Sequence, residues 1–167
     1  MFRKFKIFIQ RGMKGYCDED IYDIEYWFLT IMPKMLEEFK QKKNGYPYQF
    51  NNEEEWNKEL DLMINDLIDA NENTCRYKNK YEEPYQKAYE EFIKEYGMMG
   101  EKLMTNAERH SAIKNGKYTY HSMNEVDKYK DISNKYFEKE KYIANIQDKC
   151  KNEALDTFKH YFWNLWY

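Results

Sequence analysis

Four acidic residues near the start of the chain are the ones best placed to bind a cation: Asp18, Asp20, Asp23 and Glu25. Asp20 and Asp23 are three residues apart, so their carboxylates could share one cation on a helix face. Carboxylates are also frequent in the first turn of a helix, where they accept free backbone N–H groups and suit the positive end of the helix dipole. We favour this capping role and predict no bound metal.

The remaining residues form no local catalytic pattern. Asp156 and His160 are one helical turn apart, and a single such pair is a weak basis for a metal site. The sequence has no phosphate-binding glycine loop, no dinucleotide fingerprint, no Gly-x-Ser-x-Gly elbow and no paired Glu-x-x-His motif. We predict no catalytic residues and no cofactor, hence no enzyme. Cys–His catalysis stays open, because its partners meet in space rather than in sequence.

Residues 18–44, which begin with the acidic cluster, predict a long central helix. Apolar residues recur there at steps of three and four, as on one helix face: Ile21, Ile24, Phe28, Ile31, Met35 and Phe39, widened by Tyr22, Tyr26, Leu29 and Leu36. Pro33 predicts a kink or a short break, because it cannot donate to the carbonyl one turn back. A second helix over 52–73, opened by a capping pattern and Trp56, is expected to fold back on the first.

The second half of the chain predicts a helix from Pro84 to Gly97, a less ordered insert over 97–123 and one long helix over 124–166. The insert could contain a short helix over 106–114. The long helix ends in an aromatic cluster that must be buried or used for binding. Its candidate binding residues are Tyr161, Phe162, Trp163 and Trp166. The rest of the fold or a second copy would cover them, so a homodimer is one expectation.

In residues 2–14, Phe5, Ile7 and Ile9 alternate as in a strand, whereas Phe2, Phe5 and Ile9 suit a short helix. We favour the helix, because no second strand is evident to pair with this segment. We expect this segment to dock on the fold with its Lys and Arg side chains in solvent. The alternative is contact with a membrane surface or with nucleic acid.

Composition favours an all-α protein, a single-domain helical bundle of roughly five helices. The 167 residues fit one domain; valine occurs once, while Glu, Lys, Leu and Met are abundant. The net charge of −3 argues against bulk binding of a polyanion. Three separated cysteines suit a reducing cytoplasm, and no apolar run approaches the ~20 residues of a membrane span. Aromatics are 19% of the chain and suit protein contacts or nucleotide stacking, or else fill helix–helix seams.

Three blocks of sequence resemble a group of small phage and prophage proteins. The first block is Gly15, Tyr16, Asp18, Asp20, Tyr22, Glu25, Pro33, Gly45 and Pro47; the second is Asn52, Glu54, Glu55 and Trp56; the third is Phe158, Tyr161, Phe162, Asn164, Leu165 and Trp166. Tyr22 replaces the group's usual Trp, and Glu25 replaces its usual Asp. Residues 70–125 lie outside the resemblance.

The resemblance implies a source, a phage or prophage, more than an activity. The expected location is the cytoplasm of an infected bacterial host. With the small size and the missing catalytic motifs, it suggests a non-enzymatic accessory protein that binds and inhibits a host component. Inhibition of CRISPR machinery is the specific version to test first. One alternative is a nucleotide- or nucleic-acid-binding protein, such as a signal sponge or hydrolase. Another is a structural or replication-linked phage component.

Overall fold

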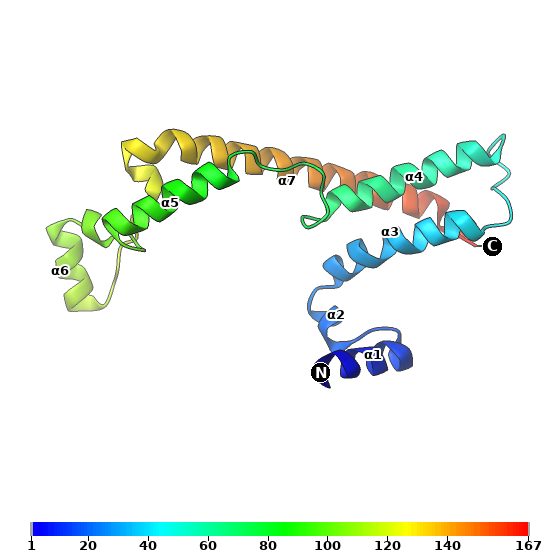
Figure 1. Cartoon of the computed structure of the whole chain (residues 1–167), viewed down its shortest axis with the longest axis horizontal. Coiled ribbons are helices and arrows are strands. Elements are labelled where there is room, and N and C mark those ends of the chain that lie inside the picture. The colour runs from blue at the N-terminus through cyan, green and yellow to red at the C-terminus, as the bar shows by residue number, and fades with distance from the viewer. Residues whose placement is uncertain (1, 167) are drawn as a thin grey trace. The chain divides into compact units, whose positions relative to one another are not determined.

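The computed structural model describes residues 2–166, and all regular structure there is helical (Figure 1). The α-helices are α1 (Phe2–Lys14), α2 (Asp18–Tyr22), α3 (Ile24–Lys42), α4 (Glu53–Ala70), α5 (Glu82–Tyr96), α6 (Asn106–Asn115) and α7 (Asp127–Tyr161). Three short 3-10 helices are η1 (Glu101–Leu103), η2 (Met123–Glu125) and η3 (Phe162–Asn164). The prediction of an all-α fold with a long C-terminal helix is therefore confirmed.

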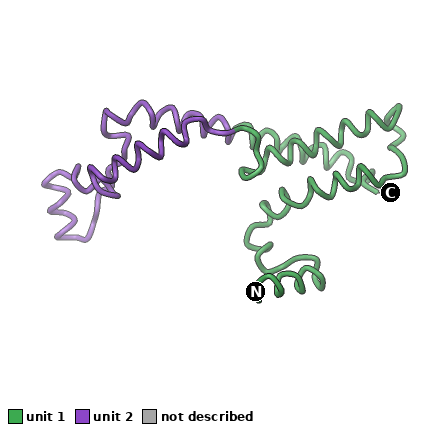
Figure 2. The backbone as a smooth tube through the Cα atoms, viewed as in Figure 1, with its two compact units in different colours: residues 1–77, 145–167 green, residues 78–144 purple. Residues whose placement is uncertain are grey.

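The chain divides into two compact units, residues 1–77 with 145–167 and residues 78–144 (Figure 2). Helix α7 contributes its second half to the first unit and its first half to the second unit. Each unit has its own cluster of buried side chains. The candidate residues at both ends of the chain lie in the first unit.

The core of the first unit forms where α3 and α4 pack against each other and against the end of α7. Its buried members are Leu29, Leu36, Trp56, Leu60, Met63, Ile64, Leu67 and Ala154. Trp56 is only 1% exposed, as its position at the start of the α4 stripe predicts. Asn52 caps α4 by accepting the backbone N–H of Glu55 at 2.9 Å. The predicted second helix is confirmed, with its end at Ala70.

The single helix predicted over 18–44 is wrong, because the chain breaks at Asp23. This residue has φ −145° and ψ 75°, outside the helical region. Its carboxylate accepts the backbone N–H of Tyr26 at 2.8 Å, so α3 starts with a satisfied cap. Pro33, where a short break was considered, is buried inside α3, which continues to Lys42. The extra break and the helices α1 and α6 raise the number of α-helices above the expected five.

The predicted core stripe of the central helix is also partly wrong. The buried residues of α3 are Leu29, Pro33 and Leu36. Ile24 and Met35, both expected in the core, are 66% and 57% exposed. The apolar surface of α3 is wider than one neighbouring helix can cover, so α4 and α7 bury one side of it. The other side stays open and forms one wall of the groove described below.

Helix α1 is present as favoured by the sequence, but the docked arrangement expected for it is wrong. None of its residues is buried. Its polar side is bound to the acids of α2, and its apolar side chains, including Phe2 at 92% exposed, face solvent.

The second unit packs α5 against the first part of α7. The buried residues of its core cluster are Phe92, Met123 and Tyr129. The rings of Tyr85 and Tyr136 stack with centroids 4.0 Å apart, and burial raises the pKa of Tyr136 to about 12. The predicted short helix in the insert is confirmed as α6.

Candidate protein-binding groove

The acidic cluster holds the N-terminal helices together instead of facing an open cation site. The Asp20 carboxylate accepts hydrogen bonds from Arg11 Nη2 at 2.6 Å and Nε at 3.1 Å, and from the backbone N–H of Cys17 at 2.8 Å. The Arg11 hydrogen bond is the main reason that the pKa of Asp20 lies well below its usual range. The Asp20 oxygens are therefore used within the protein.

The other three acids have separate roles. Asp18 accepts a hydrogen bond from Gln10 at 2.7 Å and forms an ion pair with Lys6 at 3.0 Å. Both contacts lower the pKa of Asp18. Asp23 caps α3, and Glu25 is exposed in the first turn of that helix. Within residues 2–166, no group of three or more His, Cys, Asp and Glu side chains is arranged to hold a metal ion.

The aromatic C-terminal residues divide into an anchored set and an open set. The ring of Tyr161 lies 5.1 Å from that of Trp56 and 5.5 Å from that of Phe50, and Leu165 also packs on the core. In contrast, Phe162, Trp163 and Trp166 are 48%, 83% and 73% exposed. Of the four predicted binding residues, Tyr161 is thus a core anchor, and the other three remain available for a ligand.

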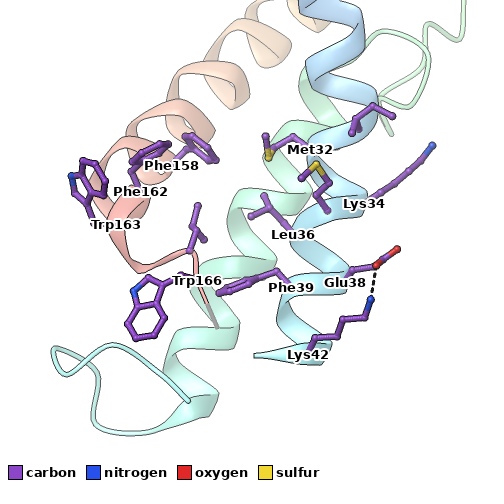
Figure 3. Close-up of a pocket in the computed structure, with 13 residues that line it drawn as sticks. Met32, Lys34, Leu36, Glu38, Phe39, Lys42, Phe158, Phe162, Trp163 and Trp166 are labelled. Atoms are coloured by element: carbon purple, nitrogen blue, oxygen red, sulfur yellow. Dashed lines mark hydrogen bonds and ion pairs between the residues drawn. The ribbon is translucent and has the colours of Figure 1, made fainter. Parts of the chain in front are cut away.

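The open residues form one side of an apolar groove of about 820 Å³ in the first unit. Figure 3 shows α3 carrying Met32, Leu36 and Phe39 on one side, with Phe158 and the C-terminal aromatics across from them. The complete apolar lining is Ile31, Met32, Met35, Leu36, Phe39, Phe158, Phe162, Trp163, Leu165 and Trp166. Such a lining favours an apolar ligand over a polar metabolite.

Among the described residues that line the groove, the charged ones lie on α3: Lys34, Glu38 and Lys42. Lys42 donates to Glu38 at 2.9 Å, one helical turn away, and this contact lowers the pKa of the Glu38 carboxyl. Lys34 has no ionic partner among the described residues. The α3 side of the groove therefore has a small excess of positive charge.

The cysteines are buried, which disfavours thiolate chemistry. Cys17, Cys75 and Cys150 are 1%, 2% and 8% exposed. Burial raises the pKa of the Cys150 thiol, and the nearby carboxylates of Asp66 and Asp69 raise it further. The nucleophilic form of this cysteine is therefore suppressed near neutral pH.

In the second unit, His121 lies between two carboxylates that connect α6 to η2. Its Nδ1 is 2.7 Å from Glu125, and its Nε2 is 3.3 Å from Glu108. The hydrogen bond to Glu125, with that to Glu108, raises the pKa of His121. An imidazole whose two ring nitrogens both contact carboxylates is a structural link rather than a general base.

No known protein helps to assign a function to the groove. No family model, curated protein or solved structure matches this chain. In the described part of the chain, no helix is both long and apolar enough to cross a bilayer.

The sequence identified the exposed tryptophans but assigned the opposite wall to the core. Ile31, Met35 and Phe39 belong to the predicted buried stripe, yet all three line the groove. The available signal was the width of that stripe, which exceeds the surface that one neighbouring helix covers.

Proposed function

We propose that this protein is a non-enzymatic binding protein whose groove accepts an apolar segment of a partner protein. The observation that carries the proposal is the pair of exposed tryptophans, Trp163 and Trp166, which line a groove of about 820 Å³ together with apolar side chains of α3, among them the exposed Met35. Tryptophan supplies a large share of binding energy in protein interfaces, and methionine adapts to varied apolar surfaces.

The length of the groove suits an amphipathic helix of the partner. Its α3 wall runs from Ile31 to Lys42, about 16 Å at 1.5 Å per residue, or three turns. A helix that presents apolar residues at steps of three and four would fill such a groove along one face.

The charged edge gives the partner helix a preferred composition. Along the α3 wall Lys42 is paired with Glu38, whereas Lys34 has no ionic partner among the described residues. An acidic residue beside the partner's apolar stripe would face this edge, and complementary charge mainly speeds association and fixes register.

The resemblance to phage and prophage proteins supports a bacterial host protein as the partner and inhibition as the outcome. CRISPR machinery is the first target class to test, in the host cytoplasm. A plasmid-interference assay tests this version: expression of the wild-type chain should restore transformation in a CRISPR-active strain, and the groove variant below should not.

Capture from bacterial lysate with matched variants tests the groove itself. Wild-type protein should retain a partner that Trp163→Ala/Trp166→Ala loses. Tyr48→Ala is the control, because Tyr48 is 96% exposed and does not line the groove. With the purified partner, calorimetry should show the double variant weakened by at least about 30-fold, since an interface tryptophan contributes about 2 kcal/mol or more. Equal affinity of wild type and double variant would contradict the proposal.

A further inference from the structure

Helix α1 presents an apolar face that the rest of the described chain does not cover. The side chains of Phe2, Phe5, Phe8, Ile9 and Met13 are between 40% and 92% exposed. At about 100° per residue these five side chains occupy one arc of about 140° on the helix. None of the residues of α1 is buried.

The polar side of α1 is held against α2 by charged pairs, so the apolar face is directed outward. Arg3 Nε lies 2.7 Å from Glu19, Lys6 Nζ lies 3.0 Å from Asp18, and Arg11 Nη2 lies 2.6 Å from Asp20. Gln10 adds a hydrogen bond to Asp18. An amphipathic helix that folds normally buries its apolar side, and here that side is left free.

Basic residues border the apolar arc on both sides. On the helical projection Lys4 lies beside Phe8 at one border, and Lys6 lies beside Met13 at the other. The helix contains five basic and no acidic residues, and three of the five (Arg3, Lys6 and Arg11) pair with the three acids of α2. The two helices together therefore keep a net charge of +2, five basic minus three acidic residues. A lysine at each border can keep its charge among lipid headgroups while its methylene chain lies along the apolar layer. We propose that α1 docks in the plane of an anionic bilayer surface, with its phenylalanines in the acyl boundary.

Charge decides between a membrane and a second copy of the chain. The apolar groove described above has on its charged edge Lys34 and the Lys42–Glu38 pair. The one acid of that edge, Glu38, already has a basic partner, so the edge does not attract the basic borders of α1, whereas anionic headgroups would. Three phenylalanines on a highly amphipathic basic helix also suit an interfacial helix, which binds through buried apolar area together with attraction to anionic lipid.

Vesicle flotation with the full-length protein tests the proposal. Wild-type protein should float with vesicles of equal phosphatidylcholine and phosphatidylglycerol, and much less with phosphatidylcholine alone. Phe5→Ser/Phe8→Ser should weaken binding to the mixed vesicles by at least about tenfold, because two phenylalanines leave the acyl boundary. Lys4→Gln/Lys6→Gln should remove most of the preference for anionic vesicles.

A matched control separates α1 from exposed apolar residues in general. Met98→Ser/Ile113→Ser changes two exposed apolar residues outside α1 and should float as wild type does. Circular dichroism should show every variant folded, since all the substituted residues are exposed. Failure of the wild type to float, or flotation unchanged in Phe5→Ser/Phe8→Ser, would overturn the proposal. So would a self-association that this variant abolishes in the absence of vesicles, because α1 would then bind a second copy.

Discussion

Helices α1 and α4 are both amphipathic, yet they use their apolar faces in opposite ways. Helix α4 buries Trp56, Leu60, Met63 and Leu67 at 1% exposure or less. Helix α1 buries nothing, although it carries three phenylalanines. The difference lies in the neighbours. Two long helices supply apolar partners to α4, whereas the contacts of α1 within the described residues are polar ones, with the short acidic helix α2. Apolar residues at helical spacing therefore predict a helix, but they do not predict whether other helices cover its apolar face.

The largest effect is expected at the buried face. Trp56→Ala should lower the free energy of unfolding by about 3–5 kcal/mol, because it leaves a cavity beside Phe50 and Tyr161. Leu62→Ala on the exposed side of the same helix should change it by less than about 0.5 kcal/mol. Urea titration measures both, and a wild-type curve for Trp56→Ala would end the assignment of α4 as the core helix.

A smaller loss is expected at the buried acid at the end of α4. Asp69 is 2% exposed and accepts hydrogen bonds from the Arg76 backbone N–H at 3.0 Å, Nε at 2.9 Å and Nη2 at 2.5 Å. Asp69→Asn should cost about 1–2 kcal/mol, moderated because the Arg76 side chain is exposed and screened.

The same pair predicts a pH dependence. Arg76 lowers the pKa of Asp69 in the folded protein. The stabilisation is therefore present above the unfolded-state pKa of about 3.9 and is lost as the pH falls below it. Urea titration at neutral pH and near pH 3 should show the wild type and Asp69→Asn converging in acid. A constant difference between them would contradict the pairing.

Loss of an apolar side chain from α1 should leave the stability almost unchanged. Phe5→Ser is expected to shift the free energy of unfolding by less than about 0.5 kcal/mol, since Phe5 is 63% exposed. Leu60→Ser in α4, where the side chain is fully buried, provides the contrast and should cost several kcal/mol. If Phe5→Ser instead destabilised by more than about 1 kcal/mol, the apolar face of α1 would be covered in solution.

The smallest effect concerns the charged pairs that hold α1. Hydrogen bonds from Gln10 and Lys6 lower the pKa of Asp18, and the hydrogen bond from Arg11 lowers the pKa of Asp20. These contacts are present above about pH 4 and weaken as the pH falls below it. Asp20→Asn removes the charged partner of Arg11 at neutral pH. Amide hydrogen exchange in α1 should therefore be faster in this variant than in the wild type, with exchange in α4 unchanged. Identical exchange in α1 of both proteins would show that the pair does not hold the helix.

The parts that the sequence predicts well are those set by local pattern. The α4 stripe, its Asn52 cap and the long C-terminal helix follow from spacing and capping chemistry within the segment itself. The break at Asp23 was missed because an acid in a first turn fits the interior of one longer helix as well as the cap of a new one. The groove was missed because coverage of Ile31, Met35 and Phe39 depends on which helices pack nearby, and periodicity does not contain that information.

Fluorine NMR of 5-fluorotryptophan-labelled protein tests the central claim, that Trp163 and Trp166 form an open binding surface while Trp56 belongs to the core. Single Trp→Phe variants assign the four signals. In the free protein, the signals of Trp163 and Trp166 should respond to the exchange of H₂O for D₂O, and that of Trp56 should not. Addition of the captured partner should shift the first two signals and remove their solvent response, leaving Trp56 unchanged. A partner that binds without moving either signal, or free tryptophans already shielded from solvent, would contradict the account.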